Sequence, residues 1–255
     1  MRFSKWHALG NSYLLVERDE LGGPLEPDLA RRLCDVRYGV GSDGVVEVAS
    51  VDGPRAEILI WNPDGSVAEF SGNGSRIAAA WLARRAGIQE VTISVSGRAY
   101  PAAVREGGML AMGVGDVEVG EIETVELGEE RVELTAVSVG NPHAVVRVEP
   151  DRETLLRLGP QLEVNGRFPE RTNVQLVRVD GPNEVTVVVW ERGAGETSAS
   201  GSSAVAVAAA AIANGWCETP VTVRMPGGEL QVELDEANQL TLVGPAEEIC
   251  DGELR

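Results

Sequence analysis

Residues 191–204, ERGAGETSASGSSA, decide the fold that the sequence predicts. A run of β-branched and aromatic residues precedes them (185–190, VTVVVW), and ten apolar residues follow (204–213, AVAVAAAAIA). This order predicts a strand, a glycine-rich turn and a helix that is apolar on every side and therefore buried. A helix N-terminus carries free backbone N–H groups and the positive end of the helix dipole. The helix start at Ser200 is therefore a predicted binding site for an anionic group.

The same construction occurs earlier in the chain, at a nearly constant offset. Trp61 and Trp190 are 129 residues apart, and so are Ser71 and Ser200. Ser71 also follows an apolar run and a turn, and it also precedes a second apolar run (77–82, IAAAWL). Chance similarity between glycine-rich turns is the alternative, but further matches in the same order favour a duplicated half-chain. They are Gly-Asn at 10–11 and 140–141, and Val-Thr at 91–92 and 221–222.

The repeat predicts an α+β fold of two pseudo-symmetric lobes. Each lobe is expected to consist of many short strands around one buried helix. Residues 1–115 form the predicted N-terminal lobe, and the tail 247–255 is a candidate to complete it. Residues 116–246 form the predicted C-terminal lobe. Local signals further predict that the helix after Ser71 ends at Gly87, that a short helix with Asp151 as its cap ends at Leu158, and that residues 113–120 are the crossover between the lobes. A length of 255 residues suits two such domains.

Composition limits the partners that the chain can have. The formal net charge is −18, which argues against nucleic acid and against an anionic membrane surface as partners. An anionic small molecule stays compatible, because Arg192 in the turn could reverse the field locally. There are three cysteines without a close pair, which predicts a reducing compartment and no disulfides. The sequence shows no metal-binding motif, signal peptide or membrane span, so we expect a cytoplasmic protein without a bound metal.

Two similar lobes can present one helix start each to a single ligand from opposite sides. A two-base racemase or epimerase needs this arrangement, because one group removes a proton and the other returns it to the opposite face. The helix ends would hold a carboxylate and stabilise the charge that develops. The alternative is a purely structural role, in which Ser71 and Ser200 only cap their helices; serine is a preferred residue at the N-cap position.

Motifs along the whole chain resemble the diaminopimelate epimerase family. They are Leu9-Gly10-Asn11, Asn-Pro-Asp-Gly-Ser (62–66), Ser-Gly-Asn-Gly (71–74), Gly-Asn-Pro-His (140–143), Phe-Pro-Glu-Arg-Thr-Asn-Val (168–174), Glu-Arg-Gly-Ala-Gly-Glu-Thr (191–197) and Pro226-Gly227-Gly228. The resemblance implies the same two-lobed α+β fold, in which each lobe is a barrel-like, mostly antiparallel sheet around a central buried helix. It also implies a cofactor-independent isomerase. It further implies interconversion of LL- and meso-diaminopimelate in lysine biosynthesis, with a homodimer as a candidate assembly.

The resemblance also implies roles for individual residues. It implies that the carboxylate attached to the reacting carbon is bound by Gly72, Asn73, Gly201 and Ser202. It implies that the distal amino-acid group of the substrate is bound by Asn62, Asn141, Asn173 and Arg192. Glu191 would contact the substrate ammonium, and Asn11 would lie near the reacting centre.

The catalytic positions depart from the family pattern, because its two catalytic cysteines fall on Ser71 and Ser200. A serine hydroxyl is a far weaker acid than a thiol and needs an adjacent base, for which His143 and Glu191 are candidates. Three interpretations stay open. The chain is a natural Ser/Ser epimerase for this or another amino acid, an ordinary epimerase whose bases were deliberately replaced, or an inactive amino-acid-binding relative.

Overall fold

The computed structural model describes residues 1–128, 130–237 and 239–254, which are mostly strands with five α-helices. The chain divides into two compact units. The first unit contains Met1–Gly113 and Gly244–Arg255, and the second contains Val114–Val243. None of the helices in the described ranges is long and apolar enough to span a membrane.

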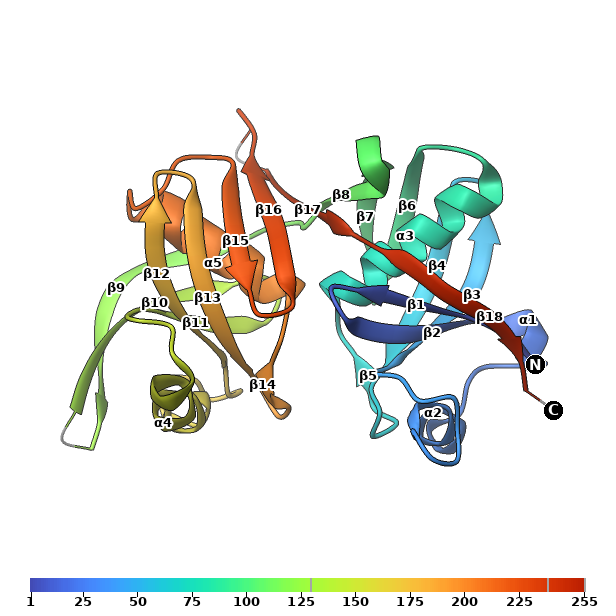
Figure 1. Cartoon of the computed structure of the whole chain (residues 1–255), viewed down its shortest axis with the longest axis horizontal. Helices are drawn as coiled ribbons and strands as arrows, with labels where there is room; N and C mark the ends of the chain where they lie inside the picture. Colours follow the sequence, from blue (N-terminus) through green and yellow to red (C-terminus); the bar gives the residue numbers. More distant parts are fainter. Residues whose placement is uncertain (129, 238, 255) are drawn as a thin grey trace. The chain divides into compact units, whose positions relative to one another are not determined.

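The first unit is a set of strands around the helix α3 (Gly72–Ala86) (Figure 1). Its strands are β1 (Arg2–Ala8), β2 (Asn11–Glu17), β3 (Val45–Asp52), β4 (Arg55–Trp61), β5 (Val67–Ala68), β6 (Glu90–Val95), β7 (Arg98–Val104), β8 (Met109–Gly113) and β18 (Glu247–Glu253). Its other helices are α1 (Arg18–Leu21), α2 (Pro27–Cys34) and the 3-10 turn η1 (Glu106–Gly108). Strands β2 and β3 are parallel, as are β4 and β6, whereas β1 pairs antiparallel with both β2 and β18.

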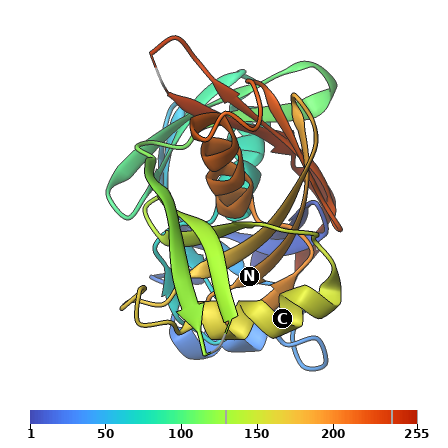
Figure 2. The same cartoon turned by 90° about the vertical axis from the view of Figure 1, so that its left-hand side faces the viewer.

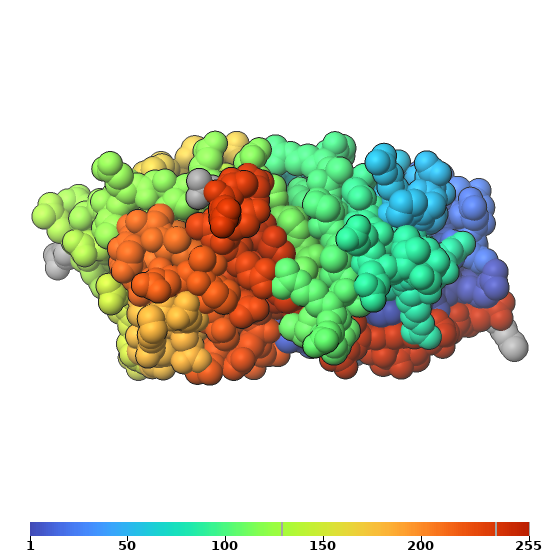
Figure 3. Space-filling view, turned by 90° about the horizontal axis from the view of Figure 1, so that it is seen from above, coloured from blue at the N-terminus to red at the C-terminus, as the bar shows by residue number. Residues whose placement is uncertain are grey.

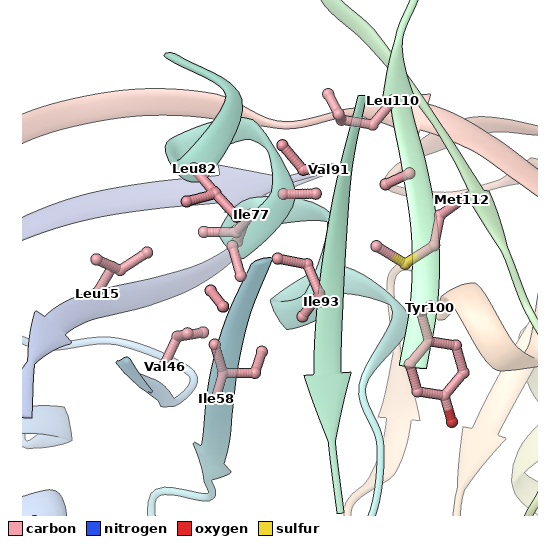
Figure 4. Close-up of a cluster of buried hydrophobic side chains, with 14 of the residues drawn as sticks. Leu15, Val46, Ile58, Ile77, Leu82, Val91, Ile93, Tyr100, Leu110 and Met112 are labelled. Carbon is pink, nitrogen blue, oxygen red and sulfur yellow. The ribbon is translucent and has the colours of Figure 1, made fainter. Parts of the chain in front are cut away.

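The core of the first unit forms where α3 packs against the surrounding strands. Ile77 and Leu82 of α3 are fully buried, and Figure 4 shows them among side chains from β2, β3, β4, β6, β7 and β8. The helix ends at Gly87, whose left-handed backbone (φ 68°) suits glycine and whose N–H bonds the Ala83 carbonyl. This confirms the predicted helix and its glycine stop.

The second unit is built around the helix α5 (Gly201–Ala213), which lies inside a set of strands in Figure 2. These strands are β9 (Glu118–Leu127), β10 (Glu130–Ser138), β11 (Pro142–Arg147), β12 (Asn173–Gly181), β13 (Glu184–Glu191), β14 (Gly195–Thr197), β15 (Val221–Met225), β16 (Gly228–Leu234) and the start of β17 (Leu240–Pro245). Strands β11 and β12 are parallel, as are β13 and β15. The orange and red surface of this unit in Figure 3 belongs to its last part, which contains β15, β16 and the start of β17.

Alanine dominates α5 because the helix is enclosed. Residues 203–211 are all buried, as the all-apolar pattern predicts. Alanine has the highest helix propensity and the smallest side chain that supports a helix, so strands can approach closely on every side.

Two local predictions need correction. The helix predicted to end at Leu158 is α4 (Arg152–Glu163), which continues through Pro160. Asp151 caps it as expected, since its side chain accepts from the Thr154 N–H. The crossover predicted over residues 113–120 extends too far, because Glu118 already begins β9, a strand of ten residues that the sequence did not indicate.

Candidate functional site

Ser71 occupies the N-cap of α3, with an extended backbone (φ −140°, ψ 117°). Its Oγ accepts a hydrogen bond from the Gly74 N–H at 3.1 Å and lies 3.1 Å from the phenolic oxygen of Tyr13. Gly72 and Asn73 follow in the first turn and are buried. The predicted helix start is therefore present, and Ser71 caps it.

Three asparagines of the first unit were predicted to bind substrate, and they lie in different environments. The Asn11 Oδ1 atom is buried and has no hydrogen-bond partner among the described residues. The Asn73 Oδ1 atom accepts from the Arg76 guanidinium at 2.8 Å. The Asn62 Nδ2 atom donates to Ser66 Oγ at 2.9 Å in the exposed turn after β4. Asn11 is the one of the three whose buried oxygen is left to accept from a ligand.

Ser200 is the N-cap of α5 and is buried, at 6% exposure. Unlike Ser71, its side chain makes no capping hydrogen bond to the helix. Gly201 and Ser202 form the start of the helix, and Gly201 is buried. The backbone N–H groups of this first turn are therefore satisfied by neither the helix nor the Ser200 side chain.

Glu191 lies at the end of β13, close to Ser200. Burial raises the pKa of Glu191, while hydrogen bonds with Thr197 and Ser200 oppose that rise. Thr197 Oγ1 donates to Glu191 Oε1 at 3.1 Å. A carboxylate whose pKa is raised by burial is a stronger base than an exposed one, and it stands next to a serine.

His143 is fully buried and has hydrogen bonds at both ring nitrogens. Its Nδ1 accepts from the Gln175 amide at 3.0 Å, so Nε2 carries the proton and donates to Asn141 Oδ1 at 3.0 Å. Burial lowers the pKa of His143 to about 3, with Arg192 adding to the effect. The imidazole is neutral at pH 7 and holds the Asn141 side chain in place, and its hydrogen bonds go to Asn141 and Gln175 rather than to a serine.

Asn173 connects the strands that carry these residues. Its Nδ2 donates to the Pro142 carbonyl at 3.0 Å, and its Oδ1 accepts from the Arg192 N–H at 3.0 Å. The parallel pairing of β11 and β12 sets His143 opposite Asn173, and Val174 of β12 lies opposite Trp190 of β13. The strand register therefore brings Asn141, Asn173, Glu191 and Arg192 to one end of this sheet.

A further acidic residue that the sequence did not indicate fixes the turn after β13. Glu163, at the end of α4, accepts from Trp190 Nε1 at 2.7 Å and from the Gly193 N–H at 2.8 Å, and pairs with Arg171. Burial favours a higher pKa for Glu163, but these three partners lower it overall. The carboxylate therefore stays charged and anchors the backbone on both sides of Glu191 and Arg192.

The structure thus distributes the predicted residues between the two units. The first unit holds Asn11, Asn62, Ser71, Gly72 and Asn73, and the second holds Asn141, His143, Asn173, Glu191, Arg192, Ser200, Gly201 and Ser202. Tyr13, Gln175 and Glu163 also belong to these groups and were missed. Only Tyr13 had a usable signal, because side chains alternate along a strand and it shares a face with Asn11.

The fold is shared by solved structures of an epimerase and of a phenazine biosynthesis protein. A hydroxyproline epimerase from Agrobacterium vitis with bound trans-4-hydroxy-L-proline matches with a TM-score of 0.75 at 15% identity, over 99% of this chain and 91% of that one. A PhzF-family phenazine biosynthesis protein from Bacillus anthracis matches with a TM-score of 0.69 at 16% identity, over 100% and 99%.

Sequence comparison narrows this class to one family. The diaminopimelate epimerase family model matches residues 3–119 and 135–249. Diaminopimelate epimerases from Desulforudis audaxviator and Desulfitobacterium hafniense are 39% and 37% identical, covering 99% and 100% of this chain and 98% of each relative. The chain belongs to the diaminopimelate epimerase family, and by class it is an amino-acid epimerase.

Proposed function

We propose that this chain epimerises diaminopimelate by cofactor-independent proton transfer at the α-carbon, with Ser71 and Ser200 in the places of the two bases. One serine receives the α-proton, and the other supplies a proton to the opposite face of the carbon. Family membership supports the reaction class. The two serines support the assignment, because each is the N-cap of a buried helix.

The observation that carries the proposal is the position of Glu191 at the end of β13, near the Ser200 hydroxyl, which makes no cap to its own helix. A serine alone is too weak an acid to act, and a neighbouring carboxylate with a pKa raised by burial supplies the missing base. As the Ser200 oxygen takes the α-proton, its own hydroxyl proton passes to Glu191. The free N–H groups at the start of α5 stabilise the negative charge that develops on the substrate carboxylate.

We also infer that the two units are the duplicated halves that the sequence repeat predicts. The support is the order of strand pairings, which is the same within each unit. In the first, β2 and β3 are parallel, β3 and β4 antiparallel, and β4 and β6 parallel. In the second, β11 and β12 are parallel, β12 and β13 antiparallel, and β13 and β15 parallel. The helices α3 and α5 fall at the same place in the two orders.

The preference for a long substrate rests on Arg192 and the asparagines of the second unit. A guanidinium binds a carboxylate with two parallel hydrogen bonds, and the backbone of Arg192 is fixed by Asn173. His143 orients Asn141 in the same group. These residues would bind the distal carboxylate and ammonium of diaminopimelate.

The test is hydrogen exchange at the α-carbon. The protein is incubated with LL- or meso-diaminopimelate in D2O, and deuterium uptake is followed by NMR. We expect uptake by the protein, loss of uptake in Ser200→Ala, and unchanged uptake in Ser198→Ala, an exposed serine two residues away. The double variant Ser71→Cys/Ser200→Cys shows whether the pocket itself is intact. Uptake by that variant alone would mean that serine does not support turnover, and no uptake by either protein would exclude diaminopimelate as substrate.

A further inference from the structure

The hydroxyl of Ser71 has a partner of its own within the first unit, the phenol of Tyr13. The two oxygens are 3.1 Å apart, and Tyr13 is buried at 8% exposure on β2. Within the second unit, Glu191 lies near Ser200, and His143 bonds Asn141. If Ser71 moves a proton, Tyr13 is the acid–base group that the first unit places in contact with it.

The hydrogen bonds around Ser71 suit proton transfer through its oxygen. The Gly74 N–H donates to Ser71 Oγ at 3.1 Å. That bond uses one lone pair of the hydroxyl oxygen and leaves the O–H free to donate to the Tyr13 oxygen. Ser71 can then take a proton from a substrate while passing its own proton to Tyr13.

A buried guanidinium supplies the charge that such a transfer needs. Arg76, on the first turns of α3, is fully buried, and its Nε and Nη1 atoms have no hydrogen-bond partner among the described residues. Burial lowers the pKa of Arg76 to about 10, and the attraction of Tyr13 opposes this fall. Arg76 is thus cationic at neutral pH, and Coulomb attraction is mutual, so Arg76 favours negative charge on Tyr13.

The backbone makes room for this ring at Gly44. A Cβ atom at residue 44 would lie 2.5 Å from Tyr13 Cε1 and 2.7 Å from the Trp61 carbonyl oxygen. The ring of Tyr13 therefore fills the space beside β3 that any larger residue would occupy. This fixes the phenol in position against Ser71.

We propose that Tyr13 exchanges protons with Ser71 and that Arg76 stabilises the phenolate, so that these three side chains act as one proton relay. In one direction the substrate Cα–H bond breaks, a new O–H bond forms at Ser71, and the original hydroxyl proton passes to the Tyr13 oxygen. The negative charge moves from the phenolate to the substrate. In the other direction Tyr13 returns its proton through Ser71 to the carbanion.

The first test needs no substrate. The chain has three tyrosines, so labelling with [13Cζ]tyrosine gives three NMR signals, which Tyr13→Phe and Tyr38→Phe assign. Replacing Arg76 by Gln should raise the midpoint of the Tyr13 titration by about one pH unit or more, because an opposite charge is lost. The signal of Tyr38, which is 83% exposed, should not move. Arg76→Lys keeps the charge and should leave the Tyr13 midpoint near its original value. If Arg76→Gln does not fold, the second test decides. A Tyr13 midpoint indifferent to the charge at residue 76 would overturn the relay.

The second test separates a relay from a merely structural contact, and it rests on the proposed function. Tyr13→Phe should slow α-proton exchange about 100-fold or more when residue 71 is serine. In the Ser71→Cys background it should slow exchange only about tenfold or less, because a thiol can ionise without the phenol. Tyr38→Phe is the matched control in both backgrounds.

The outcomes distinguish this proposal from the proposed function. Exchange that survives Tyr13→Phe, or that falls equally in the serine and cysteine backgrounds, would overturn the relay while leaving the epimerase intact. No exchange in any variant would overturn the diaminopimelate assignment, and the NMR titration would still decide whether Arg76 acts on Tyr13.

Discussion

Acidification is expected to destabilise the second unit through His143. The folded protein holds this imidazole neutral, because burial lowers its pKa from 6.5 to about 3. The unfolded chain takes up the proton below pH 6.5, whereas the folded chain does not. The stability contributed by the neutral imidazole is therefore complete above pH 6.5 and is lost as the pH falls toward 3.

The size of the effect follows from the interval between the two pKa values. Each pH unit within it corresponds to about 1.4 kcal/mol for one proton, so the loss at pH 4.5 is about 3 kcal/mol. That is a large fraction of the 5–15 kcal/mol by which domains are usually stable. Forty acidic residues also titrate in acid, so the contribution of His143 has to be isolated by a variant.

The variant is His143→Gln, whose side chain cannot be protonated in this range. Urea unfolding is measured from pH 7 to pH 4.5, and hydrogen exchange of β11 and β12 amides reports on the second unit. The stability advantage of the natural protein over the variant should shrink by about 3 kcal/mol across this range. His7→Gln, in the first unit, is the control for losing the other histidine.

A direct measurement completes the test. The chain has two histidines, so the imidazole signal that remains in His7→Gln belongs to His143. It should stay neutral down to about pH 4, with the proton on Nε2. A signal that titrates near pH 6.5, or a stability difference that does not change with pH, would refute the reasoning.

Three further changes test other parts of the structure. Glu191→Gln should remove the acid limb of the pH–rate profile. The pKa of Glu191 is raised, so its base form is lost at a higher pH than that of an exposed carboxylate. A profile that keeps the acid limb would show that another group causes it. Ala208→Leu should destabilise the second unit by about 1–3 kcal/mol in thermal unfolding, because α5 is enclosed there, whereas Ala213→Leu at an exposed position should change little. Gly44→Ala should displace the Tyr13 ring, and loss of its NMR contacts with neighbouring residues would show it, whereas an unmoved ring would contradict the close approach.

The sequence predicted the features that depend on local pattern. Both buried helices, their serine starts and the Gly87 stop follow from apolar runs, caps and glycine placement. The strand β9 was missed because five of its ten residues are polar or charged without regular alternation. The end of α4 was placed too early because a proline normally stops a helix; here Glu163 is held beyond it by Trp190 and Gly193.

The sequence did not predict contacts between residues that lie far apart in the chain. Tyr13 and Ser71 are 58 positions apart, and no spacing rule joins a strand residue to a helix cap over that distance. Asn173 was predicted to bind a ligand, and its side chain also ties β11 to the turn that bears Arg192. A residue type and a motif indicate that a side chain is at the site, whereas its hydrogen-bond partners depend on the fold.

The two helix starts are alike in backbone but unlike in their acid–base surroundings. Ser71 caps its helix and lies 3.1 Å from a phenol on which a buried cation acts, whereas Ser200 makes no cap and lies near the Glu191 carboxylate. An epimerase needs one group protonated and the other deprotonated at the start of each turnover, in either order. In the relays proposed above each serine passes its own proton on, so the neighbouring group carries the change of protonation state. We infer that the divergence of the two half-chains at Tyr13 and Glu191 gives the two serines different proton acceptors, a phenol for Ser71 and a carboxylate for Ser200.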